Sequence, residues 1–175
     1  MFNNIRTRNI VSFYCLHIFI LSFFKNILVP VDGSEHSSRA IKYATEIASK
    51  FNSKLTLLHA YFFTLPVTTS PVLPEAPHYA VMTQESINVL SQKTKKDANQ
   101  ILVQATNLVK EKNVIVKSLL REGRVVPEII KILETEKVDL IVMGARGISG
   151  IKKLFLGSTS EEVIKKANCP VLIVK

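Results

Sequence analysis

Short apolar runs alternate with longer amphipathic stretches along most of the chain. The first run, at 26–31, ends at Asp32 and Gly33, and its length and β-branched residues are typical of a strand buried on both faces. The run at 114–120 is less apolar than the others, which indicates a strand nearer the edge of a sheet. The predicted strands cover residues 26–31, 54–60, 114–120, 138–144 and 170–175.

Between these runs, apolar residues recur at the three- and four-residue spacing of a helix. Ser34 is placed to cap the first helix, and Ser158 and Glu161 have the spacing of a capping box at the start of the last one. Pro127 suits a first helical turn, where a missing N–H group costs nothing. The predicted helices cover about 35–51, 82–112, 126–136 and 158–168.

The predicted elements alternate strictly between strand and helix. Such alternation predicts an α/β fold in which helices cover both faces of a parallel sheet. Right-handed crossovers restrict the topology further, to a doubly wound sheet. Ligands of these sheets lie beyond the carboxyl ends of the strands, where the winding direction reverses. The residues that follow the predicted strands are therefore the first candidates for a binding site.

The amino-acid composition and net charge limit the classes of molecule that the protein is expected to bind. The chain has 175 residues, 47% of them hydrophobic, which is enough to bury the core of one domain. Its formal net charge of +9 favours anionic partners such as phosphates or acidic lipid, although a lysine-rich solvated surface explains the charge equally well. Nucleic-acid binding is not expected, because the lysines are spread through the helices and the aromatic residues are not interleaved with arginines. Two cysteines build neither a metal knuckle nor a disulfide framework, and Cys169 is interpreted as a small buried thiol.

Residues 1–24 differ from the rest of the chain. Arg6 and Arg8 precede an apolar run over 10–24, which resembles a signal peptide without a small-residue cleavage site and is short for a membrane span. We expect 1–24 to be a hydrophobic extension from a mis-assigned start, with a membrane anchor or targeting segment as the alternative. The folded domain is expected at 25–175, in the cytoplasm unless the preceding segment is a genuine anchor or signal.

Three of the four glycines between the end of the fourth strand and the start of the last helix suggest a phosphate loop. Glycine lets backbone N–H groups turn toward a ligand with no side chain in the way, and a helix start adds unpaired N–H groups and a favourable dipole. Gly144 and Gly147 follow the strand, and Gly157 with Ser158 stands where the helix begins. The same residues are also the ones that would merely end a strand, shape a turn and cap a helix. Arg146, Lys152 and Lys153 could screen phosphate charge.

These residues carry a resemblance to a known family. The chain from about residue 25 to its last residue resembles the universal stress protein family, in its opening "KNILVPVDGSEHSSRAIKYA" and in its last third, from "VDLIVMGARGISG" onward. Gly144, two residues, Gly147, nine residues and Gly157-Ser158 match the family's nucleotide-binding pattern G-x2-G-x9-G-[S/T] without a gap. The resemblance implies an ATP-binding member, because family members that do not bind nucleotide lack these glycines.

The resemblance also implies a fold and an assembly. The family has a flavodoxin-like three-layer sandwich, a Rossmann-like arrangement related to the adenine nucleotide alpha hydrolases, with five parallel strands in the order 3-2-1-4-5. Many members form homodimers by pairing their last strands. The corresponding strand here, 170–175, is short and apolar, so an unpaired edge there needs covering.

Site residues carry over position by position. In this resemblance one group flanks the adenosine, another approaches the ribose and a third holds the phosphates of ATP, ADP or AMP. No residue ligates the metal directly, since Mg²⁺ or Mn²⁺ is expected through phosphate oxygens, although Asp32 could lie near it or accept a hydrogen bond from the ribose. The implied contacts are Pro30, Val31, Asp32 and Ala60 to the adenosine, Met143 and Gly144 to the ribose, and Arg146, Gly147, Gly157, Ser158, Thr159 and Ser160 to the phosphates.

The function expected from this is a dimeric stress-response sensor or regulator that uses bound adenine nucleotide. Two alternatives stay open: a slow ATPase or nucleotidyl-transfer enzyme, and a structural dimer without nucleotide. No general base stands beside the glycines in the sequence, so no catalytic residue is expected. The proline-rich loop at 61–80 is either a lid over the adenine or a loose connection.

Four polar residues have structural explanations beside functional ones. His59 is expected to be hydrogen-bonded within the sheet layer, with contact to a ligand as the alternative, and His36 is expected on the surface of a first helical turn. Asp32 also suits an Asx turn or a helix cap. Asp139 begins a strand at the opposite edge from the proposed site and is interpreted as a solvated turn residue.

Overall fold

A computed structural model describes residues 24–64, 83–109, 113–148 and 156–175. The hydrophobic extension up to residue 23, most of the 61–80 loop, and the pair Lys152 and Lys153 lie outside these ranges, so the expectations for them stay predictions. The strands are β1 (Asn26–Pro30), β2 (Lys54–Tyr61), β3 (Ile115–Glu122), β4 (Leu140–Gly144) and β5 (Val171–Val174). The helices are α2 (Glu35–Phe51), α3 (Gln84–Asn107), α4 (Val125–Thr135) and α5 (Ser158–Lys166).

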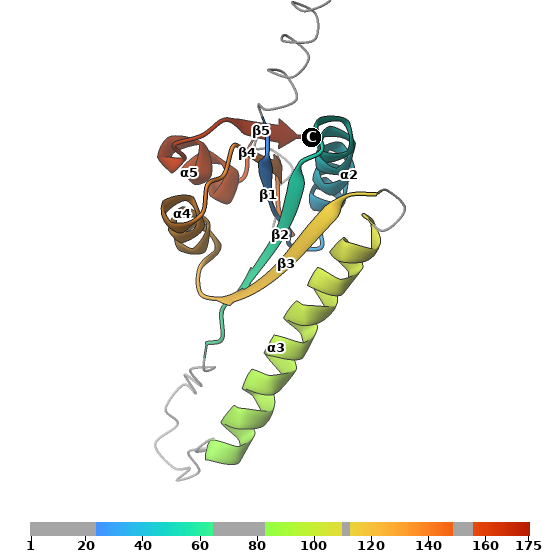
Figure 1. Cartoon of the computed structure of the whole chain (residues 1–175). Helices are drawn as coiled ribbons and strands as arrows, with labels where there is room; N and C mark the ends of the chain where they lie inside the picture. Colours follow the sequence, from blue (N-terminus) through green and yellow to red (C-terminus); the bar gives the residue numbers. More distant parts are fainter. Residues whose placement is uncertain (1–23, 65–82, 110–112, 149–155) are drawn as a thin grey trace, which may run out of the picture.

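The strands form one parallel sheet in the order β3-β2-β1-β4-β5, which confirms the predicted fold class and strand order. Helices α2 and α3 cover one face of the sheet, and α4 and α5 cover the other (Figure 1). The least apolar strand, β3, lies at one edge as its composition predicted. From β1 the chain adds β2 and β3 on one side of the sheet, and it then adds β4 and β5 on the other side. The topological switch point, where the direction of winding reverses, therefore lies between β1 and β4.

The central strand β1 divides the core into two halves. Ile27 and Val29 point into the cluster under α2 and α3, whereas Leu28 points into the cluster under α4 and α5. All three side chains have at most 1% of their surface exposed. Complete burial of such a side chain contributes about 1.5–3 kcal/mol, so the two apolar layers fix β1 firmly in the middle of the molecule.

Helix α3 is much longer than the sheet it covers. Its buried residues, Ala98, Leu102 and Ala105, all lie in its C-terminal half. The N-terminal half extends beyond the sheet, as Figure 1 shows. None of the helices in the described ranges combines the length and the hydrophobicity needed to cross a membrane.

The helix starts differ from one another. Ser34 caps α2 as predicted, since its hydroxyl accepts a hydrogen bond of 3.1 Å from the Ser37 N–H group. The capping box predicted for α5 is wrong, because Gly157 is the N-cap residue and no side chain caps this helix. Glu161 instead pairs with Lys165, one turn further along. The Ser158 hydroxyl is therefore not used to start the helix.

The amino ends of the strands are tied together by a side chain. Asp139 Oδ2 accepts hydrogen bonds of 2.9 Å from the backbone N–H groups of Lys25 and Asn26. The interpretation of Asp139 as a solvated turn residue is thus wrong: it is half-buried and it joins the start of β4 to the start of β1. Cys169, just before β5, is half-buried rather than fully buried, and desolvation raises the pKa of its thiol.

Candidate functional site

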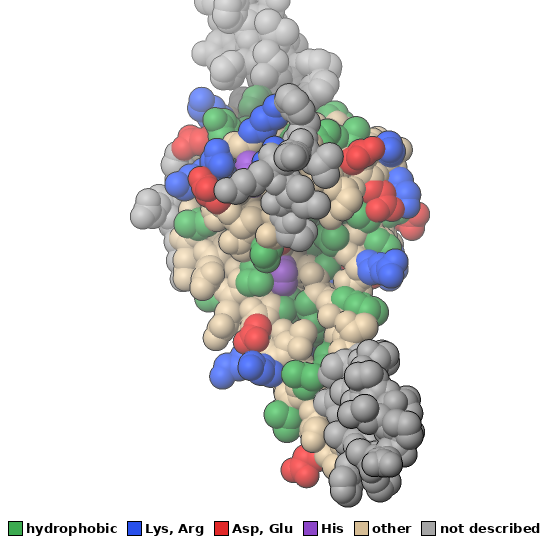
Figure 2. Space-filling view, turned by 180° about the vertical axis from the view of Figure 1, so that it is seen from behind, with side chains coloured by type: hydrophobic (Ala, Val, Ile, Leu, Met, Phe, Trp, Pro, Cys, Tyr) green, Lys and Arg blue, Asp and Glu red, His purple; other side chains and the backbone are tan. Residues whose placement is uncertain are grey.

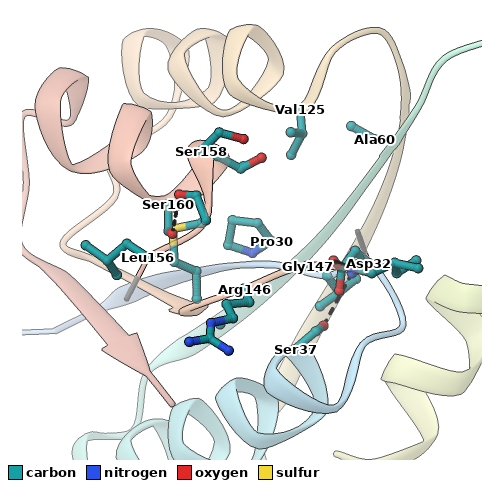
Figure 3. Close-up of a pocket in the computed structure, with 16 residues that line it drawn as sticks. Pro30, Asp32, Ser37, Ala60, Val125, Arg146, Gly147, Leu156, Ser158 and Ser160 are labelled. Atoms are coloured by element: carbon teal, nitrogen blue, oxygen red, sulfur yellow. Dashed lines mark hydrogen bonds between the residues drawn. The ribbon is translucent and has the colours of Figure 1, made fainter. Parts of the chain in front are cut away.

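A pocket of about 640 Å³ opens at the carboxyl ends of the strands. It lies at the topological switch point, because Pro30 ends β1 and Met143 and Gly144 end the neighbouring strand β4. The first turn of α5 and the start of α4 complete its walls. Figure 3 shows Pro30 in the middle of this group, with Ser158 and Ser160 on one side and Asp32 on the other.

The structure brings all of the sequence-predicted site residues together in this pocket. They come from the ends of three strands, from the β4–α5 connection and from the first turn of α5, and they are Pro30, Val31, Asp32, Ala60, Met143, Gly144, Arg146, Gly147, Gly157, Ser158, Thr159 and Ser160. Four further lining residues were not predicted, namely Ser37, Val125, Ile148 and Leu156. Val125 had a usable signal, because it opens the helix after β3 and such connections all meet at this edge of the sheet.

The two ends of the β4–α5 connection are fastened to each other. The Ala145 carbonyl accepts hydrogen bonds from the Gly157 N–H group at 2.8 Å and from the Ser160 hydroxyl at 3.0 Å. The Ala145 N–H group in turn donates to the Val174 carbonyl at 2.7 Å, on β5. The start of α5 is therefore held at a fixed position beside the end of β4.

The first turn of α5 faces the pocket with donors that the helix itself does not use. The first backbone N–H groups of a helix have no partner within it, and the helix dipole favours an anion there. At this start the residues are Ser158, Thr159 and Ser160, which all line the pocket. The hydroxyl of Ser160 is already bonded to two backbone carbonyls, whereas Ser158 is exposed and makes no cap bond.

Two of the three glycines have a reason within the fold. A Cβ atom on Gly144 would stand 2.8 Å from the backbone carbon of His36, at the start of α2. A Cβ atom on Gly147 would stand 2.5 Å from the Asp32 carboxylate. Glycine is thus needed at Gly144 for the backbone of α2 to approach the β4–α5 connection, and at Gly147 a Cβ atom would displace the Asp32 carboxylate from its present position.

The third glycine, Gly157, has no such reason. Its φ of −78° is open to any residue, and a Cβ atom would meet its nearest neighbour, the Ala145 carbonyl oxygen, at an ordinary contact distance of 3.4 Å. Gly157 is also a pocket residue and the N-cap of α5. The absence of a side chain here leaves free the approach to the helix start.

Asp32 organises the pocket rim. Its Oδ1 atom accepts a hydrogen bond of 3.0 Å from the Ser34 N–H group, which is the predicted Asx turn. Its Oδ2 atom accepts one of 3.1 Å from the Ile148 N–H group, in the β4–α5 connection. The Asp32 N–H group donates to the Ser37 hydroxyl at 3.3 Å. Both carboxylate oxygens of Asp32 therefore accept hydrogen bonds from backbone N–H groups. These bonds join the loop that follows β1 to the loop that follows β4.

The two histidines near this edge stay outside the pocket lining. His59 is buried, and its Nδ1 atom lies 2.7 Å from the Val31 carbonyl oxygen, which confirms the structural interpretation. It holds the ends of β1 and β2 together just below the pocket. His36 is half-buried rather than a surface residue, because its backbone packs against Gly144.

The pocket has hydrogen-bond donors at one end and apolar side chains at the other, which suits a ligand that joins an anionic group to an apolar one. Ala60 and Val125 lie next to each other on the side of the pocket away from Arg146 (Figure 3). Helix N–H groups, a free hydroxyl and the Arg146 side chain are suited to anionic oxygens. Within the described ranges, no cluster of three or more His, Cys, Asp or Glu side chains could hold a metal ion.

Comparison with known proteins agrees with this fold over nearly its full length. A sequence profile of the universal stress protein family matches residues 23–175. A universal stress protein of Methanocaldococcus jannaschii is 31% identical over 168 residues, covering 94% of this chain and 92% of that protein. The structure resembles universal stress protein UspA from Lactobacillus plantarum, with a TM-score of 0.69, 26% identity, and coverage of 88% of this chain and 99% of that one.

A further solved structure is a universal stress protein in complex with cAMP. It superimposes with a TM-score of 0.62 at 25% identity, covering 87% of this chain and 98% of that one. The profile match spans far more than half of the chain, and the sequence relative exceeds 30% identity over almost its whole length. The chain belongs to the universal stress protein family.

Proposed function

We propose that this protein binds an adenine nucleotide in the pocket between β1 and β4. The observation that carries the proposal is Gly157, an N-cap residue that lines the pocket and whose lack of a side chain is not required by its backbone conformation or by a close contact. A ligand anion approaching the start of α5 explains the glycine, because a side chain there would stand in its way. Support comes from the related universal stress protein that was solved with cAMP.

The polar and apolar residues that line opposite ends of the pocket determine how the nucleotide is oriented in it. The phosphates lie against the first turn of α5, where the N–H groups of Ser158 and Thr159 and the Ser158 hydroxyl supply donors. The adenine lies at the apolar end, against Ala60 and Val125. Gly144 and Met143, at the end of β4, lie between these two ends and face the ribose. ATP is the expected ligand, with ADP or AMP as shorter occupants.

A divalent cation is expected to arrive with the phosphates rather than in a site built by the protein. The carboxylate in the pocket lining, Asp32, has both oxygens engaged by backbone N–H groups. Mg²⁺ typically keeps several waters and is bound through substrate phosphates with one or two carboxylates. Asp32 is thus at most an outer neighbour of Mg²⁺ or Mn²⁺, and its main task is to hold the rim.

Binding without rapid turnover fits the same geometry. A general base needs a free acceptor within hydrogen-bond reach of the attacking water. The Asp32 carboxylate is committed to the backbone, and the His59 Nδ1 atom lies against the Val31 carbonyl oxygen. We therefore propose a nucleotide-dependent sensor or regulator of the stress response, acting in the cytoplasm, rather than an efficient ATPase.

The proposed regulator is a homodimer joined through the 170–175 strand. β5 is an edge of the sheet, and Leu172 on it is 37% exposed. An apolar edge strand without a partner is a hazard that proteins usually cover. Sedimentation equilibrium is expected to give twice the chain mass, and Leu172→Lys is expected to shift the protein toward the monomer.

The nucleotide proposal is tested by what the protein carries when it is purified. Natively purified protein is acid-quenched and its supernatant is analysed for adenine nucleotides, alongside a Gly157→Val variant. ATP, ADP or AMP is expected from the unmodified protein and none from the variant. Free nucleotide at 100 times its Kd adds about 2.7 kcal/mol of stability, so a rise in melting temperature on adding Mg-ATP is expected as well.

A matched control separates binding from folding. Ile148→Val alters a lining residue through its side chain only, since Ile148 contributes its backbone N–H group to Asp32. This variant is expected to keep its nucleotide. If neither purified protein nor added Mg-ATP shows binding, the glycines serve only the fold and the proposal is wrong.

A further inference from the structure

Three serines at the start of α2 use their hydroxyl groups in different ways. The Ser34 hydroxyl accepts a hydrogen bond of 3.1 Å from the Ser37 N–H group, and it donates one of 3.4 Å to the Arg146 carbonyl. The Ser38 hydroxyl donates a hydrogen bond of 3.1 Å to the Ser34 carbonyl. The hydroxyl protons of Ser34 and Ser38 are therefore both used within the protein.

The third hydroxyl group, that of Ser37, is only partly used. Its oxygen accepts a hydrogen bond of 3.3 Å from the Asp32 N–H group, whereas no group among the described residues accepts the proton that Ser37 can donate. Ser37 is only 4% exposed, and it lines the pocket. An acceptor for this proton is therefore to be looked for in a ligand of the pocket.

Ser37 borders the part of the pocket to which the ribose of the proposed nucleotide is assigned. A Cβ atom on Gly144 would stand 3.0 Å from the Ser37 nitrogen, and Gly144 is one of the two residues proposed to face the ribose. Figure 3 shows Ser37 on the opposite side of Pro30 from both Ser158 and Val125. Ser37 thus lies away from the phosphate end and from the apolar end of the pocket, and next to its middle.

A ribose hydroxyl group is the complement of this donor. Such a hydroxyl can both accept and donate a hydrogen bond, and its presence at the 2′ carbon is what distinguishes a ribonucleotide from a deoxyribonucleotide. A buried donor that loses its partner is left unsatisfied, which is unfavourable. For this reason, a site built to bond a hydroxyl of its ligand discriminates strongly against the analogue that lacks this hydroxyl.

We propose that Ser37 makes the pocket selective for ribonucleotides, by donating a hydrogen bond from its hydroxyl group to a ribose hydroxyl oxygen. The proposal rests on the proposed function, because it requires a nucleotide in the pocket. The Asp32 N–H group occupies one acceptor position of the Ser37 oxygen and so leaves the Ser37 proton available to the ligand. Ser37 is thereby a specificity-determining residue, and deoxyribonucleotides bind more weakly than ribonucleotides.

The charge of the protein does not provide this selection. ATP and its deoxy analogues carry the same charge, so an electrostatic attraction acts equally on all of them. On the face of the molecule that Figure 2 shows, acidic side chains also lie among the basic ones. Selection between these ligands therefore requires a hydrogen bond at the sugar, and Ser37 is placed to donate it.

Calorimetric titration of the full chain with Mg-ATP, 2′-deoxy-ATP and 3′-deoxy-ATP tests the proposal. The unmodified protein is expected to bind one of the two deoxy analogues about tenfold more weakly than ATP, because the Ser37 donor then stays unpaired. The Ser37→Ala variant is expected to bind ATP about tenfold more weakly than the unmodified protein does, and to bind that same analogue as strongly as ATP. The four affinities form a double-mutant cycle between the two hydroxyl groups.

The matched control is Ser38→Ala, which removes a hydroxyl group from the same helical turn. The Ser38 hydroxyl donates its proton within the helix, and Ser38 is not among the lining residues of the pocket. This variant is expected to keep the discrimination between ATP and the analogue. A second variant, Ser37→Cys, nearly keeps the size of the side chain but offers only a weak donor, and it is expected to lose most of the discrimination.

The ratio of the affinities separates selection from a structural role. If Ser37 only stabilised the start of α2, the Ser37→Ala variant would bind ATP and both analogues more weakly by the same factor, and the proposal would be wrong. Equal binding of all three nucleotides by the unmodified protein, or full discrimination in Ser37→Ala, would overturn this proposal and leave the proposed function intact. Absence of binding by any of the three would overturn the proposed function, and this proposal with it.

Discussion

The two ends of the parallel strands are built for different tasks. At the amino ends, Asp139, Ser53 and the packed ring of Phe24 tie neighbouring segments together. At the carboxyl ends a pocket of about 640 Å³ remains open, and the donors of the α5 start face it. Side-chain to backbone hydrogen bonds therefore stabilise the fold at both ends, but only the carboxyl ends, among the described residues, also leave donors of a helix start facing a pocket.

The strongest test of this contrast is at the amino ends. Asp139→Ala is expected to lower the free energy of unfolding by about 3 kcal/mol, because two backbone N–H groups lose their acceptor. Urea unfolding measures the change. Asp139→Asn serves as the control, since one amide oxygen can accept both hydrogen bonds and should restore most of the stability. The contrast breaks down if Asp139→Ala leaves stability unchanged but weakens nucleotide binding.

The next effect concerns a contact between two loops at the carboxyl ends. Gly147→Ala places a Cβ atom 2.5 Å from Asp32 Oδ2, and the strain is expected to cost about 2 kcal/mol of stability. In an Asp32→Ser background the same change is expected to cost much less, because the carboxylate is gone. A double-mutant cycle by urea unfolding measures the coupling. Strict additivity of the two changes would show that Gly147 is not there to accommodate Asp32.

Two serines in the first turn of α5 are expected to have different roles, one in stability and one in nucleotide binding. Ser160→Ala is expected to cost about 1 kcal/mol of stability, because its hydroxyl bonds the carbonyls of Ala145 and Gly157. Ser158→Ala is expected to leave stability unchanged and to weaken nucleotide binding, since this hydroxyl makes no cap bond. Thermal unfolding without ligand and calorimetric titration with Mg-ATP separate the two outcomes. The reverse pattern would exchange the roles assigned to them.

The smallest effect is chemical. Partial burial and the neighbouring Asp139 raise the pKa of the Cys169 thiol, so less of the reactive thiolate is present at a given pH below that pKa. Iodoacetamide is therefore expected to modify Cys169 more slowly in the native protein than in urea. Mass spectrometry of the peptides distinguishes Cys169 from Cys15. A faster native reaction would show that the amino end beside β5 is more open than its contacts indicate.

Hydrophobic patterning was sufficient for the elements, and the family resemblance was needed to name most of the pocket residues. Hydrophobic runs and helical spacing predicted each described strand and helix, and the resemblance supplied the strand order. The predicted pocket residues follow strands or begin a helix, which is where an α/β fold places ligands. Leu156 was missed because an apolar lining residue has no chemical signature that distinguishes it from core, whereas Val125 was missed although its place after β3 pointed to this edge of the sheet.

Contacts between distant segments could not be predicted. The capping box at Ser158 failed because Ser160 and Gly157 instead bond the Ala145 carbonyl, which only the folded sheet brings close. The reason for Gly147 is Asp32, which lies far away in the sequence and reaches the same loop through the Ile148 N–H group. Local patterns describe neighbours in the chain, and these contacts join β1 to β4.

The proposed function requires that the missing side chain of Gly157 leaves room for a bound nucleotide. Calorimetric titration of Mg-ATP into the unmodified protein and into Gly157→Ala tests it most directly, with the melting temperature of each protein measured without nucleotide. The variant is expected to bind Mg-ATP at least about tenfold more weakly, equivalent to about 1.4 kcal/mol. It is expected to lose at most about 1 kcal/mol of stability, the usual cost of alanine at an N-cap. Equal affinities would show that the added methyl group does not meet a ligand, and the proposed role of Gly157 would then be wrong.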